Sequence, residues 1–273
     1  MDMNERPSQY DGNENGYGSK DLRGQGGYGY SDQRSQDGYT PGYRGQGSPD
    51  APQAGVKKFL KECPVTVALA AANVLVWIVL AIQGDTESSR FMFAHGAMWP
   101  ESVLSGEYYR LFTATFLHFG PVHLLNNMLM LVVLGHEVEI PVGHVRFLIC
   151  YLLSGLSGSL LSFFNMMRTG EYALACGASG AIFGIMGMML VVIVVHKGRY
   201  ERYTVRRLLV MIALSLYFGF TSGSVDNAGH VGGLVGGFVL CFLIYGIPFI
   251  IRKCYTEKLS GSQDRRIPGS RNQ

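Results

Sequence analysis

Six apolar stretches of about twenty residues each fill most of the chain after residue 55. A helix rises about 1.5 Å per residue, so each stretch is long enough to cross a hydrocarbon core of about 30 Å. The composition agrees, since only 16% of the residues are charged, against roughly 25% in ordinary soluble domains. The sequence therefore predicts an all-α membrane protein with six transmembrane helices, at about residues 62–83, 120–140, 145–166, 174–195, 205–221 and 228–251.

The composition changes abruptly outside these stretches. Residues 1–55 are rich in Gly, Tyr and Gln and nearly lack aliphatic side chains, so they cannot bury enough apolar surface to offset the entropy of ordering. We expect a disordered tail at 1–55, a helical domain at 56–252 and a short polar tail at 253–273. The first tail is interpreted as solvated in preference to an interaction segment, and no signal peptide is expected before the first apolar stretch.

Lysine and arginine residues indicate the orientation of the helices. Six spans place both termini on one side, and the flanks on that side hold most of the basic residues. We therefore expect both termini in the cytoplasm, and a long external segment at about 84–119 whose aromatic residues favour packing into the membrane surface. The cytoplasmic set is Lys57, Lys58, Lys61, Arg146, Lys197, Arg199, Arg202, Arg206, Arg207, Arg252, Lys253 and Lys258, whereas the external set is only Arg90, Arg110 and Arg168.

The five cysteines lie mostly in or beside apolar stretches and show no CxxC or Cys/His spacing. They are interpreted as small buried hydrophobic residues, which argues against a disulfide framework and against a metal site. A net charge of +3 is too small to indicate nucleic-acid binding, since the basic residues gather beside apolar segments. No metal, cofactor or nucleic-acid partner is expected.

Polar side chains inside apolar stretches are costly, so each is a candidate for function. His123 and Asn127 lie near the outer end of the second stretch, and Ser179 lies about one and a half turns into the fourth. His230 lies in the first turn of the sixth stretch. All of these placements converge on the outer third of the membrane.

Glycines at every fourth residue predict how two of these helices meet. Small residues at this interval let helices approach closely in a membrane. A close crossing of the fourth and sixth helices would hold Ser179 beside His230, although the same glycines also fit simple packing. The two sets are Gly180 and Gly184, and Gly229, Gly233 and Gly237.

These side chains suit nucleophilic attack on an amide. An imidazole at position 230 can take the proton of the Ser179 hydroxyl and return it to a leaving group. His123 and Asn127 are four residues apart, so both lie on one helix face and can donate to the developing oxyanion. The backbone N–H of Ser179, near a helix N-terminus, is a third donor.

Other interpretations apply to single residues. An isolated serine in a membrane helix often bonds a backbone carbonyl one turn earlier, and His118 fits a half-solvated packing residue better than a catalytic one. Asp226 precedes a helix, so capping is preferred over membership of a catalytic triad. Three further histidines lie toward the cytoplasmic side, away from the cluster, namely His136, His144 and His196.

Four motifs in order resemble those of the rhomboid family of intramembrane serine proteases. They are GEYYRLFTATFLHFGPVHLLNNMLML at 106–131, GHEVE at 135–139, GASG at 177–180 and DNAGHVGG at 226–233. The resemblance covers about residues 90–245, and it implies a six-helix bundle with a long membrane-associated loop between the first two helices.

The resemblance also implies roles for individual residues. Ser179 resembles the nucleophile and His230 the general base of a two-residue dyad, while His123 and Asn127 resemble the oxyanion donors. Phe183 takes the place of an aromatic residue, often Tyr, that stacks on the catalytic histidine. The remaining matches are Arg110, which follows Tyr109 where many members have Trp-Arg, the box glycines Gly177 and Gly180, and Glu139 as a structural residue.

The implied function is a serine endopeptidase that cleaves transmembrane segments of other membrane proteins within the bilayer. Its expected location is a plasma membrane, with bacterial origin preferred. The first alternative is a catalytically inactive rhomboid-like protein that binds transmembrane helices. A small transporter or haem-binding protein is disfavoured, because the histidines divide between the two membrane faces instead of pairing at one depth.

Overall fold

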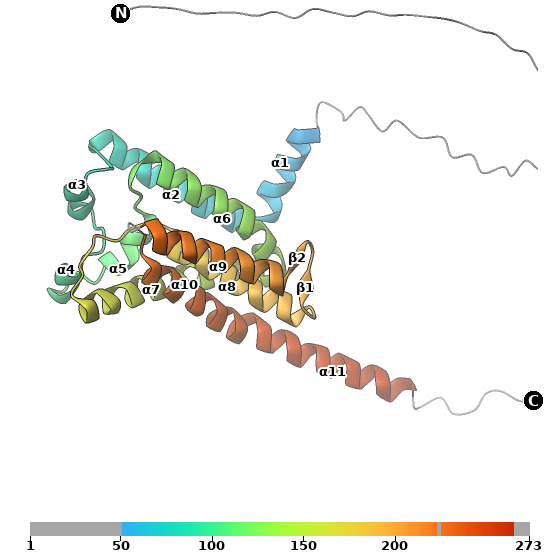
Figure 1. Ribbon diagram of the computed structural model, residues 1–273. Coiled ribbons are helices and arrows are strands. Elements are labelled where there is room, and N and C mark those ends of the chain that lie inside the picture. The colour runs from blue at the N-terminus through green and yellow to red at the C-terminus, as the bar shows by residue number, and fades with distance from the viewer. Residues whose placement is uncertain (1–50, 223–224, 265–273) are drawn as a thin grey trace, which may run out of the picture. The chain divides into compact units, whose positions relative to one another are not determined.

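The computed structural model describes residues 51–222 and 225–264, and most of them lie in helices (Figure 1). Helices suit a membrane chain because they satisfy the backbone N–H and C=O groups within the segment. The long helices are α1 (Ala51–Glu62), α2 (Pro64–Gln83), α6 (Gly120–Val142), α7 (His144–Thr169), α8 (Ser179–Val195), α9 (Val205–Ser222), α10 (Asn227–Cys241) and α11 (Ile247–Asp264). Shorter elements are α3 (Ser89–Ala94), α4 (Pro100–Leu104), α5 (Arg110–Thr113), the 3₁₀ turn η1 (Ala114–Phe116), the π-helical turn η2 (Phe242–Gly246), and the antiparallel strands β1 (Arg199–Tyr200) and β2 (Tyr203–Thr204).

Each of the six predicted apolar ranges contains a long helix, and the last range runs without a break from α10 through η2 into α11. Among the described residues, three helical segments are long and apolar enough to cross a membrane by themselves: Pro64–Gln83, His144–Thr169 and Asn227–Lys258. A fourth candidate joins Arg110–Phe116 to Gly120–Val142 across an 87° bend. The described part of the chain thus contains three or four candidate spans by length and composition, and α8 is a shorter apolar helix.

The predicted tails differ from the structure at their inner ends. Residues 51–55, assigned to the disordered tail, form the start of α1, whose early Pro52 is compatible with a first helical turn. Residues 253–264, assigned to the polar tail, continue α11, because residues 253–260 contain no glycine or proline to end the helix. Residues 1–50 and 265–273 lie outside the described part of the chain.

The close crossing predicted from the glycine repeats is present between α8 and α10. A methyl group on Gly233 would overlap with the carbonyl oxygen of Gly180, and one on Gly237 would overlap with that of Gly184. Helix α7 joins the same contact, since a methyl group on Gly158 would lie 2.7 Å from the carbonyl oxygen of Gly229. Backbone therefore packs on backbone where the three helices meet, which only glycine allows.

Glu139 ties α2 to α6 at the end of the bundle opposite the α3–α5 segment. Its buried carboxylate accepts hydrogen bonds from the backbone N–H groups of Val65 (2.9 Å) and Thr66 (2.7 Å), and from the Thr66 hydroxyl (2.6 Å). These N–H groups belong to the first turn of α2 and have no partner within their own helix. The negative charge also faces the positive end of the helix dipole, so Glu139 fixes where α2 begins.

Candidate active site

Ser179 and His230 lie together at the N-terminal ends of their helices. The distance from Ser179 Oγ to His230 Nε2 is 2.9 Å. Ser179 is the first residue of α8, and His230 is the fourth residue of α10 and is buried. The glycine crossing brings α8 and α10 close enough for this contact.

The prediction that Ser179 lies one and a half turns into a helix is wrong. The residues just before Ser179 form an extended segment. Ala175 in this segment exchanges backbone hydrogen bonds of 2.9 and 3.0 Å with Met98, which lies in the turn after α3. Gly177 has a φ of +133°, which side chains rarely allow, and its N–H donates to the carbonyl of Ala114 at 2.8 Å. Helix α8 therefore starts at Ser179, and the backbone N–H of Ser179 has no partner inside the helix.

Phe183 supports the histidine ring. It lies one turn after Ser179 on α8, so its side chain projects from the same face. The rings of Phe183 and His230 are stacked, with centroids 4.2 Å apart and planes 13° apart. This contact needs only the face of the aromatic ring, so a phenylalanine suffices.

Asp226 acts as a helix cap. Its Oδ1 accepts a hydrogen bond of 2.8 Å from the backbone N–H of Gly229 at the start of α10. Within the described residues, Nδ1 of His230 is buried and has no hydrogen-bond partner. The capping interpretation is confirmed, and Asp226 does not orient the imidazole through a hydrogen bond.

His123 and Asn127 lie beside the backbone that leads into Ser179. A methyl group placed on Gly177 would lie 2.9 Å from His123 Nε2 and 3.6 Å from Asn127 Nδ2. Asn127 is buried, and its Nδ2 has no hydrogen-bond partner among the described residues. Both side chains thus approach the Cα of Gly177, two residues before Ser179 in the chain.

A cavity of about 1120 Å³ opens onto these side chains. Its walls include Ser179, His230, His123 and Asn127, and also residues of the segment after α2 and of α9. The serine hydroxyl is therefore reached through a cavity that lies between these elements. The contributing residues beyond the four are Glu87, Ser89, Phe119, Asn126, Met130, Leu174, Ala175, Cys176, Ile182, Phe183, Met186, Ser215, Phe218, Gly219, Val225 and Asp226.

The sequence predicts that His118 is a half-solvated packing residue, and this prediction is wrong. Its side chain is fully buried, and its Nε2 accepts a hydrogen bond of 3.3 Å from the backbone N–H of Ala178. Its ring also packs edge-on against His123 at 5.2 Å. His118 precedes the first residue of α6, so helical spacing from His123 could not reveal this contact.

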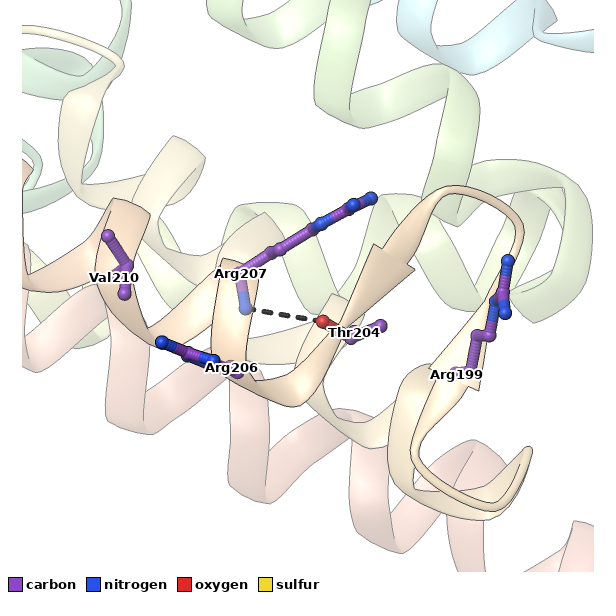
Figure 2. A pocket seen from close by; sticks show the side chains of 5 residues that line it. All are labelled: Arg199, Thr204, Arg206, Arg207 and Val210. Carbon is purple, nitrogen blue, oxygen red and sulfur yellow. Dashed lines mark hydrogen bonds between the residues drawn. The ribbon is translucent and has the colours of Figure 1, made fainter.

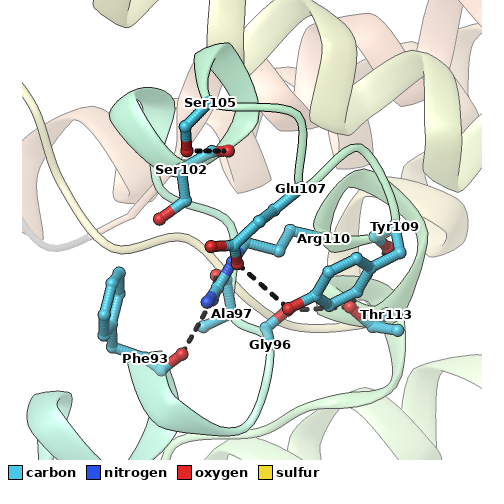
Figure 3. Close-up of polar contacts among 9 residues, drawn as sticks. All are labelled: Phe93, Gly96, Ala97, Ser102, Ser105, Glu107, Tyr109, Arg110 and Thr113. Carbon is cyan, nitrogen blue, oxygen red and sulfur yellow. Dashed lines mark hydrogen bonds and ion pairs between the residues drawn. The ribbon is translucent and has the colours of Figure 1, made fainter.

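Arg110 holds the α3–α5 segment together (Figure 3). Its buried guanidinium donates through Nη1 to the carbonyls of Phe93 (2.7 Å) and Ala97 (2.9 Å), and through Nε to the carboxylate of Glu107. The hydrogen bonds from Arg110 and Tyr109 hold the pKa of Glu107 below its ordinary range. One arginine thus joins α3, the turn after it and α5.

Arg110→Ala is expected to lower the free energy of unfolding by about 3 kcal/mol, because the part-buried carbonyl of Phe93 and the buried carbonyl of Ala97 lose their donor. Glu107 has a depressed folded pKa, so its ion pair contributes fully above its unfolded pKa of about 4.3 and loses that contribution as the pH falls through the folded value. The difference in free energy of unfolding between the native chain and Arg110→Ala should therefore become smaller below about pH 4. Thermal unfolding in detergent measures both effects. The control is Arg90→Ala, an exposed arginine on α3, and equal losses from both variants would contradict the assigned role.

Metal ligands are not gathered in the described part of the chain, where no group of three His, Cys, Asp or Glu side chains could hold a metal ion.

Comparisons with known proteins agree with one family. A family model described as the Rhomboid domain matches residues 105–247, just over half of the chain. Rhomboid protease GluP of Bacillus subtilis is 38% identical over 173 residues, which is 63% of this chain and 33% of that protein. RHOMBOID-like protein 7 of Arabidopsis thaliana is 38% identical over 160 residues, or 58% of this chain and 50% of that protein. RHOMBOID-like protein 1 of the same plant is 35% identical over 208 residues, which is 73% of this chain and 51% of that protein.

The aligned part thus spans between a third and about half of the length of these relatives. The domain match includes the stretches that carry Ser179, His230, His123 and Asn127. It also includes α6 to α10, which contain apolar helices that suit a bilayer. The chain belongs to the rhomboid family and is an integral membrane protein that crosses the bilayer more than once.

Proposed function

We propose that this chain is a serine endopeptidase that cleaves transmembrane segments of other proteins within the membrane. The observation that carries the proposal is the 2.9 Å contact between Ser179 Oγ and His230 Nε2, with Phe183 stacked on the imidazole. The name of the Bacillus subtilis relative, a rhomboid protease, supports an active enzyme. The alternative is an inactive relative that only binds transmembrane helices, and the presence of both Ser179 and His230 argues against it.

The proposed reaction uses these groups in sequence. Nε2 of His230 accepts the hydroxyl proton as Ser179 Oγ attacks the scissile carbonyl carbon, and the carbonyl oxygen becomes an oxyanion. Donors for this charge are the Ser179 N–H, Asn127 Nδ2 and the His123 ring. The protonated His230 then gives its proton to the leaving amine. Water afterwards releases the acyl group and restores Ser179.

The proposal includes the arrangement in the membrane. All six predicted ranges cross the bilayer, both termini are cytoplasmic, and the site faces the outer leaflet of a bacterial plasma membrane. A substrate helix must unwind before its peptide bond reaches Ser179, because helical carbonyls are hydrogen-bonded and shielded. Residues such as glycine that weaken helices lower this cost by about 1 kcal/mol each.

Labelling with a fluorescent fluorophosphonate tests the serine chemistry. The purified full chain in detergent should react, and digestion followed by mass spectrometry should place the adduct on Ser179. Ser179→Ala should not react, and His230→Ala should react far more slowly because the hydroxyl keeps its proton. An adduct on another residue, or equal labelling of Ser179→Ala, would remove Ser179 from the mechanism. A folded native chain that neither reacts nor cleaves transmembrane substrates would instead favour the helix-binding alternative.

A further inference from the structure

A second cavity lies where the β1–β2 hairpin meets the start of α9, and arginine dominates its lining. It has a volume of about 550 Å³ and is lined by Arg199, Thr204, Arg206, Arg207 and Val210 (Figure 2). The hairpin follows the last residue of α8, whereas Ser179 is its first residue. The cavity is therefore at the opposite end of the bundle from the α3–α5 segment and is separate from the candidate active site (Figure 1).

The positive charges of this cavity are not neutralised within the described chain. None of the ion pairs among the described residues involves Arg199, Arg206 or Arg207. Arg207 Nη1 donates only to the carbonyl oxygen of Arg202, at 2.7 Å, and its backbone N–H donates to the Thr204 hydroxyl at 3.3 Å. The neighbouring carboxylate of Glu137 is 3.2 Å from Arg202 instead. Three arginines thus line one cavity without an ion-pair partner among the described residues.

Two of these arginines are placed against the helix dipole. Arg206 and Arg207 are the second and third residues of α9, whose first turn contains no acidic residue. Cations at the positive end of a helix are unfavourable, whereas an anion there is stabilised by the dipole. A bound anion would offset both the unfavourable interaction of these arginines with the helix dipole and the repulsion between the arginines.

The depth of the cavity is indicated by the residues that follow. Leu209, Val210 and Leu214 are apolar and about half exposed, at 49%, 52% and 51%. In an integral membrane protein such a face lies against acyl chains, and arginines one turn earlier lie at the level of the headgroups. The cavity includes Val210, so it joins the charged level to the apolar face.

We propose that this cavity binds the phosphate headgroup of an anionic phospholipid. The planar guanidinium groups of Arg199 and Arg206, which make no other polar side-chain contact in the described chain, suit the oxygens of a phosphate. The acyl chains lie along the exposed side of α9, past Leu209 and Val210. Basic pockets at the end of membrane helices bind headgroups by this chemistry, and a free phosphate would lack the apolar contacts.

Lipid binding by the purified full chain in neutral detergent tests the proposal. Native mass spectrometry would compare dioleoyl phosphatidylglycerol with dioleoyl phosphatidylcholine for the native chain and for Arg199→Gln/Arg206→Gln. At about 1 kcal/mol for each arginine near a headgroup, the native chain should prefer phosphatidylglycerol about thirtyfold, and the double variant should lose most of this preference. The matched control, Arg252→Gln/Lys253→Gln, removes two exposed charges from α11 and should keep the preference.

Three outcomes would overturn the proposal. The first is that the double variant keeps the native preference for phosphatidylglycerol. The second is that the α11 control loses as much of this preference as the double variant. Competition by inorganic phosphate at the same free concentration as the lipid would show that the cavity takes a free anion. Single Arg199→Gln should lower the preference about fivefold, which keeps the test decisive if the double variant is poorly folded. None of these measurements depends on proteolysis.

Discussion

Ser179→Ala is expected to reduce cleavage of a transmembrane substrate by at least about ten-thousandfold. The alanine removes the proposed nucleophile while leaving the proposed oxyanion donors and the cavity around them in place. The same loss is expected for His230→Ala, because the hydroxyl then has no group to accept its proton at 2.9 Å. The double variant should be no slower than either single variant, since the two residues act as one unit. Cleavage in liposomes, followed by gel electrophoresis, measures each rate.

Ser162→Ala is the matched control for this experiment. Ser162 is a fully buried serine on α7, and its hydroxyl has no hydrogen-bond partner among the described residues. Its replacement removes an unsatisfied polar group, so folding and cleavage should both be retained. Substantial cleavage by folded Ser179→Ala would contradict the proposed mechanism, whereas a loss in Ser162→Ala would show that cleavage reports general damage.

Gly233→Ala is expected to destabilise the protein by at least about 3 kcal/mol. The added methyl group would overlap with the carbonyl oxygen of Gly180, which is backbone and cannot move away by changing a rotamer. Helices α8 and α10 would have to separate, and the contact between Ser179 and His230 would lengthen with them. Thermal unfolding in detergent measures the loss of stability, and fluorophosphonate labelling reports the state of the site.

The opposite side of this contact offers a control. A methyl group on Gly180 would lie 3.4 Å from its nearest neighbour, the carbonyl oxygen of Gly229, which is an ordinary contact. The free energy of unfolding of Gly180→Ala should therefore lie within about 1 kcal/mol of the native value, whereas that of Gly233→Ala should be lower by more than this. Equal unfolding temperatures for the two variants would show that the helices do not cross as closely as the structure has them.

Much of the candidate site could be predicted because its residues follow helical spacing. His123 and Asn127 are four residues apart on α6, and Phe183 is four residues after Ser179 on α8, so each pair shares a face. The glycine repeats likewise predict which faces of α8 and α10 meet. Each of these inferences uses residues within one helix, where geometry follows from sequence distance.

Residues outside the helices could not be placed in this way. His118 contacts the backbone of Ala178, sixty residues later in the chain. The start of α8 at Ser179 depends on the hydrogen bond from Gly177 to the carbonyl of Ala114 and on the pairing of Ala175 with Met98. No local pattern encodes such contacts, because they join the α3–α5 segment and the turn before α6 to residues more than fifty positions later in the chain.

The sequence by itself determined that the chain enters a membrane as apolar helices, and which polar side chains lie near one end of them. Length and hydropathy decide this, because an unsatisfied backbone N–H or C=O group is costly in hydrocarbon. A helix is stable there since it pairs these groups within the segment. The tertiary structure alone decided that Ser179 begins its helix, that His118 is buried beneath it, and that three arginines surround one cavity at the other end. These features depend on contacts between segments far apart in the chain, whose geometry is fixed only when the helices pack.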